Sequence, residues 1–281
     1  FCQPKETVKV DKVPEKTCDD DPSLCSTDQL CGQGVTFESG DAEWRVDNAR
    51  YVLEAKRREL SCGVSVASIS DQEDSPLIME CDKLTASITE PIVLQGKVKG
   101  VPDDRLDGWK ALDACRKALD KFPEHTRTWF HMGRAYFKLR HIESVHWFRR
   151  AALDGYVSAQ QHLWMILIFR YGLGIPSDYI EGAKWLREAA KGGDIMSAAN
   201  LILFLQNGQF LEKNTSEAAQ LYLSFLSGGF AYFQKPDVMA GLSSETITEL
   251  QEILAQEGVY LGAIDGMMGP QTEMAMKTRV P

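Results

Sequence analysis

The side chains best suited to chemistry in this chain are histidines and cysteines, and the histidines do not have the spacing of an active site. His141 and His146 are five residues apart, which places them on different faces of a helix and away from the spacing of helical metal ligands. The sequence has no His-Glu-x-x-His pair, phosphate-binding loop, Gly-x-Ser-x-Gly turn or dinucleotide fingerprint. The other histidines are His125, His131 and His162. We therefore expect no metal, no cofactor and no enzymatic activity.

All seven cysteines lie in the first half of the chain, which is typical of a secreted protein whose amino-terminal part needs covalent closure. The alternative is a zinc site. Cys18, Cys25 and Cys31 are six or seven residues apart, however, which is wider than a zinc knuckle, and no histidine lies near them. The pattern favours disulfides and a periplasmic or secreted location.

The pairing of the cysteines does not follow from the sequence alone, and an odd number leaves at least one free or paired between chains. Our working pairs are Cys31–Cys62 and Cys81–Cys115. The second pair would tie the entry of a helical region to the segment before it, so we interpret Cys115 as structural rather than nucleophilic. The cysteines whose pairing stays open are Cys2, Cys18 and Cys25.

The overall composition excludes two classes of function. The chain has 281 residues, a net charge of −9 and a sequence pI of about 5.2, so it lacks the broad basic surface that nucleic acids attract. The longest apolar run, Leu163 to Phe169, is too short to cross a bilayer. We expect no nucleic-acid binding and no transmembrane segment.

Changes in composition and periodicity divide the chain into four parts. Residues 1–26 are polar and predict an extended or disordered arm. Residues 27–107 form a disulfide-stapled segment, residues 108–242 a series of helices, and residues 243–281 a small helical domain. Within the second part we expect a helix from about Trp44 to Leu60, a short strand at 63–71 and a helix from Ile78 onward.

An internal repeat defines the third part. The stretch Trp147–Gly155 is similar in sequence to Trp185–Gly193, about 38 residues later, and to Leu221–Gly229, about 36 residues after that. Small residues let neighbouring helices approach, Trp147 and Trp185 fill the gap between hairpins, and each stretch ends on a glycine suited to a left-handed cap. Because one hairpin cannot bury its apolar face alone, the units must stack.

The pattern from Tyr171 through Gly174, Asp178 and Trp185 to Gly193 resembles a Sel-one-like (Sel1-like) repeat, a relative of the tetratricopeptide repeat. Residues 111–137 are similar to a tetratricopeptide unit that leads into the array. The resemblance implies a right-handed α-solenoid of helical hairpins that binds a protein partner and is not catalytic. Candidate partner-binding residues, which the repeat itself does not require, are Gln161, His162, Arg170 and Asn200.

The segment 243–281 resembles a small helical peptidoglycan-binding domain. Thr246 and Glu249 predict a capping box, Gly258 predicts the end of that helix, and Pro270 predicts the first turn of another. The candidate peptidoglycan-binding residues are Tyr260, Asp265, Gly266 and Thr272. The alternative is that this segment only caps the solenoid.

The sequence thus predicts a mainly α, non-catalytic scaffold or adaptor of the bacterial envelope. In this hypothesis the solenoid binds a protein partner and the C-terminal segment holds it near peptidoglycan. A second hypothesis is a structural subunit of a larger envelope complex, with the C-terminal segment packed internally. A third, a wall hydrolase, would need a catalytic pair that the sequence does not offer.

Overall fold

The structure is a computed structural model of the chain. It describes residues 17–19, 22–36, 43–45, 48, 51, 52, 54, 55, 58, 60–62, 75–90, 93 and 95–279. Most of these residues are helical, so the predicted mainly α class is confirmed. Apart from single positions, the helix expected from about Trp44 to Leu60 lies outside the described residues, as do the strand at 63–71 and the arm before residue 17.

The chain forms two compact units, residues 1–66 and 67–281. The boundary between them falls inside the segment 27–107, which the sequence analysis treated as one part. The helix expected from Ile78 onward therefore belongs to the second unit and not to the cysteine-rich segment before it.

The first unit is closed by disulfides around a small core. Bonds join Cys18 to Cys25 and Cys31 to Cys62, and the side chains of Leu30, Tyr51 and Ala55 are buried beside them. A core of this size supplies little stability, so covalent closure contributes much of it. The elements of this unit are η1 (Pro22–Leu24), α1 (Thr27–Gly34) and the antiparallel strands β1 (Val35–Thr36) and β2 (Glu43–Trp44).

Residues 17–19 and 22–26, assigned from the sequence to an extended arm, have local structure instead. The Cys18–Cys25 disulfide closes a short loop that contains η1. Arg58 fixes this loop by donating hydrogen bonds to the carbonyl oxygens of Ser23 and Cys25, at 2.7 and 2.8 Å. Local sequence patterns do not reveal this contact, because Arg58 is more than 30 residues away along the chain.

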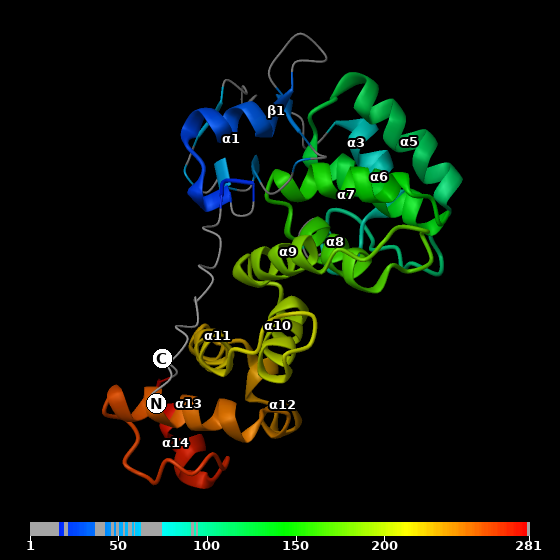
Figure 1. Cartoon of the computed structure of the whole chain (residues 1–281). Coiled ribbons are helices and arrows are strands. Elements are labelled where there is room, and N and C mark those ends of the chain that lie inside the picture. Colours follow the sequence, from blue (N-terminus) through cyan, green and yellow to red (C-terminus); the bar gives the residue numbers. More distant parts are fainter. Residues whose placement is uncertain are drawn as a thin grey trace, which may run out of the picture. The chain divides into compact units, whose positions relative to one another are not determined.

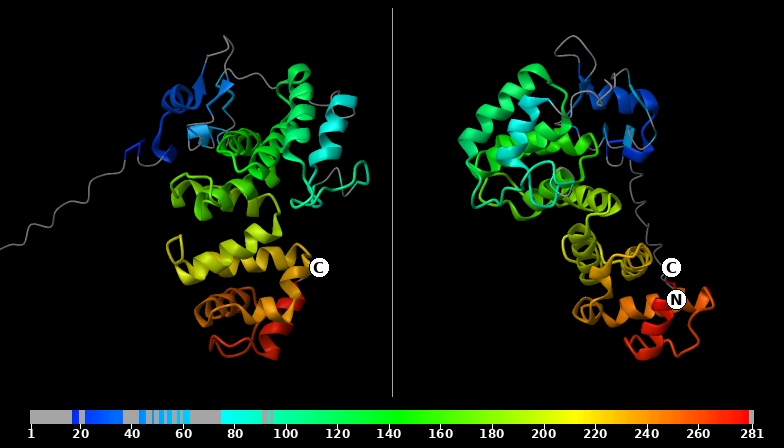
Figure 2. Two further views of the ribbon diagram at one scale, coloured as in Figure 1. Left: turned by 90° about the vertical axis from the view of Figure 1, so that its right-hand side faces the viewer. Right: turned by 180° about the vertical axis from the view of Figure 1, so that it is seen from behind.

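The second unit is a stack of helices in which each one packs against the next (Figures 1 and 2). In the left view of Figure 2, the helices follow one another in layers in chain order, from green to orange. None of the described helices is long and apolar enough to cross a membrane. The helices are α3 (Pro76–Thr85), α5 (Gly108–Lys121), α6 (Thr126–Lys138), α7 (Glu143–Leu153), α8 (Val157–Phe169), α9 (Tyr179–Lys191), α10 (Ile195–Asn207), α11 (Thr215–Ser227), η4 (Ala231–Gln234), α12 (Pro236–Ala240), α13 (Ser244–Gln256) and α14 (Pro270–Arg279).

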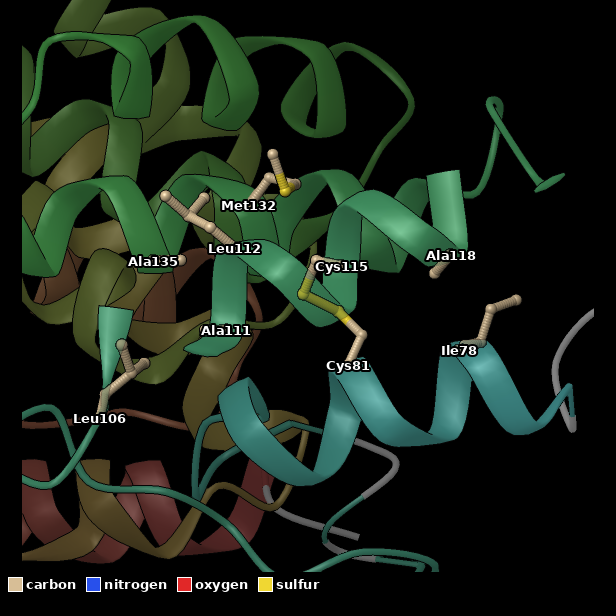
Figure 3. Close-up of a cluster of buried hydrophobic side chains, with 9 residues drawn as sticks. All are labelled: Ile78, Cys81, Leu106, Ala111, Leu112, Cys115, Ala118, Met132 and Ala135. Atoms are coloured by element: carbon tan, nitrogen blue, oxygen red, sulfur yellow. A yellow bond between two sulfur atoms is a disulfide. The ribbon is translucent and has the colours of Figure 1, made fainter. Parts of the chain in front are cut away.

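The stack begins with α3, which a disulfide holds against α5. Cys81 and Cys115 are both fully buried, and their bond lies in an apolar cluster with Ile78, Leu112 and Met132 (Figure 3). This bond and Cys31–Cys62 are the two working pairs of the sequence analysis. The Cys81–Cys115 bond therefore fixes the first helix of the stack to the repeats that follow.

Small residues let the helices of the repeats approach closely. The alanine pairs Ala151–Ala152 and Ala189–Ala190 are buried. At Gly133 there is no room for a side chain, because a β-carbon there would lie 2.5 Å from the Phe148 ring. The glycines that end the second helices have φ angles of +85°, +89° and +76°, which confirms the predicted left-handed caps at Gly155, Gly193 and Gly229.

The two tryptophans at equivalent repeat positions differ in burial. Trp185 has no exposed surface, and its indole nitrogen donates to Glu181 at 3.0 Å. Trp147 is partly exposed and packs against the apolar cluster that surrounds the Cys81–Cys115 bond. Trp147 therefore packs against the start of the stack, whereas Trp185 is enclosed within it.

An ion pair recurs from one repeat to the next. Arg149 on α7 binds Glu181 on α9 through two hydrogen bonds of 2.8 Å. One repeat later, Arg187 on α9 binds Glu217 on α11 at 3.0 and 3.2 Å. Both glutamates lie in the first turn of their helix, where the helix dipole also favours a negative charge. The bridge therefore sets the register between successive hairpins.

We predict that the first of these bridges contributes more stability than the second. The side chains of Arg149 and Glu181 are 20% and 17% exposed, whereas those of Arg187 and Glu217 are 41% and 35% exposed. Arg149→Gln removes the cation from a largely desolvated carboxylate, which keeps only its hydrogen bond from Trp185 among the contacts described, and should lower the unfolding free energy by about 1–3 kcal/mol. Arg187→Gln is the matched control and should cost at most about 1 kcal/mol in urea unfolding. Equal losses would contradict this account.

The C-terminal segment continues the stack. α13 packs on α11 and buries Ile247, Leu250 and Leu254. The predicted capping box at Thr246 is wrong, because the helix begins earlier. Ser243 is in extended backbone and accepts the Thr246 amide at 3.1 Å, so it is the N-cap. The predicted start of α14 at Pro270 is confirmed.

Candidate partner-binding groove

A buried cluster of charges is the strongest electrostatic feature of the second unit. His131 on α6 lies between two carboxylates, with Nδ1 3.1 Å from Asp82 Oδ1 and Nε2 2.9 Å from Glu90 Oε2. Arg127, one turn earlier on α6, donates two hydrogen bonds to Asp82 at 3.0 and 3.2 Å. The hydroxyl of Tyr156 donates to Glu90 at 2.7 Å. The side chains of Asp82, Glu90 and His131 have no exposed surface.

The ionisation states of this cluster balance one another. Burial by itself disfavours the imidazolium, but the carboxylates of Glu90 and Asp82 outweigh it and raise the pKa of His131. Burial likewise acts against ionised Asp82 and Glu90, yet their hydrogen bonds and charge interactions with His131 lower the pKa of both. The cations Arg127 and His131 thus face the anions Asp82 and Glu90, and their charges balance inside the protein.

The cluster holds elements of the fold together and does not reach a substrate. A histidine between carboxylates has the residue types of a general acid–base pair, but such a pair must reach a substrate. Here each side chain of His131, Asp82 and Glu90 is fully buried and bonded within the cluster. The cluster therefore ties α3 and the segment after it to α6 and α8.

Sequence reasoning missed this cluster, although one signal was present. Arg127, His131 and Arg134 are spaced four and three residues apart, so they share one face of α6. That face is buried. Three basic residues on the apolar face of a helix require buried acidic partners. The identity of those partners could not be read from the sequence, because Asp82 and Glu90 lie more than one helix away.

We predict a loss of stability above neutral pH that depends on His131. Because its folded pKa is raised, the stabilisation is complete below the unfolded value of about 6.5 and is lost as pH rises toward the folded value, with a slope of up to about 1.4 kcal/mol per pH unit. Urea unfolding between pH 6 and 9 measures this slope. His131→Gln should be less stable at pH 6 and should lose most of the slope.

The exposed His141 provides the control for this experiment. His141→Gln should keep the slope of the wild-type chain. If the His131→Gln chain lost stability between pH 6 and 9 as steeply as wild type, the raised pKa of His131 would be refuted.

A groove lies between the C-terminal end of α6 and the loop that joins α8 to α9. Its volume is about 340 Å³. Rings form much of its wall, with the Phe137 and Tyr171 rings 5.9 Å apart at their centres. The lining residues are Asp103, Leu106, Arg134, Phe137, Lys138, Arg140, His162 and Tyr171.

The loop that carries Tyr171 has an unusual backbone. Arg170 and Tyr171 have φ angles of +63° and +40°, and Arg140, across the groove, has +53°. Each such conformation costs on the order of 1–3 kcal/mol for a residue with a side chain. Leu173, which is buried, and the bond from the Asp178 amide to the Leu167 carbonyl at 3.0 Å anchor the loop. The fold thereby holds a 40% exposed Tyr171 at the edge of the groove.

The charges of the groove are unevenly paired. Arg134 binds Asp103 and the carbonyl oxygens of Thr85 and Val101. Lys138 donates to the carbonyl oxygens of Asp103 and Asp104, at 2.7 and 3.1 Å, and no carboxylate of the described residues is paired with it. Arg140 is exposed and has no ion pair within the part of the chain that the structure describes. The groove therefore carries excess positive charge on an acidic protein.

His162 adds a neutral polar group to the wall. Burial lowers the pKa of His162, so the imidazole is uncharged near neutral pH. Its Nδ1 atom donates to the Ser158 carbonyl at 2.7 Å. The Nε2 atom is then a hydrogen-bond acceptor.

Only one of the four residues predicted to bind a partner lines this groove. His162 does so. Arg170 is next to Tyr171 at the exposed end of α8. Asn200 is on α10 and donates to the Met196 carbonyl at 2.7 Å, and Gln161 is partly buried on α8. Gln161 and Asn200 do not line the groove, because its lining comes from the C-terminal end of α6, from His162 and from the loop that follows α8.

The four residues predicted to bind peptidoglycan surround the side chain of Gln251, which is fully buried. Its Oε1 atom accepts the amides of Asp265 and Gly266 at 3.0 and 2.9 Å. Its Nε2 atom lies 2.9 Å from Asp265 Oδ1, 3.2 Å from the Tyr260 hydroxyl and 3.1 Å from Thr272 Oγ1. The structure thus brings the four predicted residues together, but through bonds within the segment.

The repeats match a known family. Residues 141–156, 167–194 and 197–234 match the Sel1 repeat, which confirms the Sel1-like resemblance and identifies this region as Sel1-like helical repeats. Repeats of this family commonly act as protein-interaction scaffolds and are generally not catalytic. No curated protein gives a significant sequence match.

Two solved structures are similar to the chain at low identity. A Sel1 repeat protein from Oxalobacter formigenes is 18% identical, with 83% of this chain and 84% of that chain covered and a TM-score of 0.42. A protective antigen present in uropathogenic Escherichia coli strains, which displays an SLR fold, is 15% identical. The alignment covers 90% of this chain and 63% of that chain, with a TM-score of 0.37. At these scores the assignment of the repeats depends on the family match.

Proposed function

We propose that this chain is a non-catalytic adaptor whose Sel1-like repeats bind a protein partner through the groove between α6 and the α8–α9 loop. The observation that carries the proposal is the groove itself. It combines exposed aromatic surface at Tyr171 with cationic groups at Lys138 and Arg140 that have no carboxylate partner among the described residues. Aromatic and arginine side chains are the ones most enriched where proteins bind each other.

We further propose that the adaptor works in an oxidising compartment, the periplasm or the extracellular space. Three disulfides support this location. The Cys81–Cys115 bond fixes α3, whose Thr85 carbonyl accepts a hydrogen bond from Arg134 in the groove, so reduction of this bond would loosen the support of that side chain.

The C-terminal segment is proposed to cap the solenoid, as the second hypothesis from the sequence states. Its helix α13 covers α11, and Gln206 exchanges two bonds of 2.9 Å with the Gly241 carbonyl and the Ser243 amide at the junction. The internal bonds of Gln251 use the polar atoms that would have to face a sugar or peptide. Both features support capping over peptidoglycan binding.

A site-specific photo-cross-linking experiment tests the adaptor function. We predict that a benzoylphenylalanine at Tyr171, in the full chain expressed in its native host, gives a discrete cross-linked band. Because Tyr171 is at the edge of the proposed interface, the band should contain one dominant partner by mass spectrometry. The matched control places the probe at Met274 on α14, which is 68% exposed and distant in the chain.

The control should give no such band. Identical bands from both positions, or no band from Tyr171, would refute binding of a partner at the groove. A purified complex of the identified partner with the full chain then supplies an affinity for comparing groove variants.

Co-sedimentation with purified peptidoglycan sacculi tests the role of the C-terminal segment. If it is a cap, the full chain should remain in the supernatant, and Asp265→Asn should not change that fraction. Asp265→Asn is a mild change because the amide oxygen can still accept the bonds from Gln251 and Met267. Retention of the wild-type chain on sacculi and its loss in Asp265→Asn would favour peptidoglycan binding instead.

A further inference from the structure

We propose that the groove binds an acidic peptide segment of its partner, with a carboxylate at Arg140 and an apolar side chain packed against the rings of Phe137 and Tyr171. This inference rests on the proposed adaptor function and specifies the chemistry of its ligand. It follows from the way in which the charges of the groove are paired.

Electrostatic complementarity is the first step. The whole protein has a net charge of −9, so most of its surface repels an acidic ligand. At the groove the sign is reversed, because Asp103 is already paired with Arg134 and leaves Lys138 and Arg140 in excess. An acidic segment would therefore be attracted to the groove.

The position of Arg140 is the second step. Its guanidinium lies against the backbone of the α8–α9 loop, because a β-carbon on Gly172 would be 3.4 Å from an Arg140 terminal nitrogen. The guanidinium therefore lies at the edge of the groove, close to Tyr171. A planar guanidinium there can bind a carboxylate through two parallel hydrogen bonds.

The aromatic wall is the third step. The Phe137 and Tyr171 rings are 5.9 Å apart at an angle of 73°, and both line the same groove as the neutral His162. An apolar side chain next to the carboxylate would be buried against these rings. The Nε2 atom of His162 can accept a backbone N–H of the same peptide. A free inorganic anion would use only the cations and none of these groups.

Binding of defined peptides to the full chain tests the proposal. The probes are rhodamine-labelled peptides in which Phe, Leu, Tyr or Trp is flanked by Asp and Glu, and their counterparts with Asn and Gln, measured by fluorescence anisotropy. We expect at least one acidic peptide to bind at least about tenfold more tightly than its amide counterpart, with an affinity that falls as salt is raised.

Single substitutions in the groove should change the affinity for the acidic peptide in opposite directions. Arg140→Gln should weaken binding of the acidic peptide by about tenfold, and Tyr171→Ala should weaken it by several-fold. Asp103→Asn removes the carboxylate of the groove and should strengthen binding by about two- to fivefold. Lys277→Gln is the matched control, with the same charge change on an exposed residue of α14, and should alter the affinity by less than about twofold.

Three results would overturn the proposal. One is binding of acidic and amide peptides with equal affinity, or no binding of any acidic peptide. Another is an equal effect of Arg140→Gln and Lys277→Gln. The third is displacement of the peptide by inorganic phosphate beyond that by sodium chloride of equal ionic strength, which would indicate a free-anion site. If the cross-link at Tyr171 forms but the peptides fail, the adaptor function stands and only the acidic ligand is wrong.

Discussion

A hairpin of two short helices cannot bury its own apolar face, and this constraint determines how the second unit is built. Each hairpin must share a seam with the next, so the seam repeats its small residues, its capping glycines and its bridge between an arginine and a first-turn glutamate. A stack of this kind leaves two open ends. The disulfide-linked α3 covers one end, and α13 covers the other.

The two ends are closed by different means, and the difference explains where the polar network lies. Near the first end, α6 places basic side chains on its buried face, and Asp82 and Glu90 neutralise them from the segment that the Cys81–Cys115 bond holds in place. A buried charge that loses its partner is costly, so this segment must dock in one position. At the other end, Gln251 plays the equivalent role with neutral hydrogen bonds.

The sequence predicted what local pattern controls and missed what distant residues control. The left-handed caps at Gly155 and Gly193, the Sel1-like repeats and the start of α14 follow from spacing, and the structure agrees. Capping at Ser243 was missed because Thr246 offered an equally good local signal. The charged cluster around His131 was missed because its partners come from another element. The groove was found only in part, through His162, because its cations Lys138 and Arg140 come from the end of α6 and the residue pair after it, far from His162 in the sequence.

The same reasoning explains why a groove forms at this place and not at every repeat. At the α8–α9 loop, Arg170 and Tyr171 adopt left-handed backbone where a glycine would be less strained, and Tyr171 is left exposed. The next repeat puts Gly208 at the equivalent helix end, and Phe210 there packs against Phe204 and Tyr179. Both rings contact aromatic residues of neighbouring helices, because Tyr171 also packs against Phe137 and Phe169, and Phe210 also has a left-handed backbone. The difference lies in exposure: Phe210 is half-buried, whereas Tyr171 is exposed at the edge of the groove, beside cations that no carboxylate of the described residues neutralises.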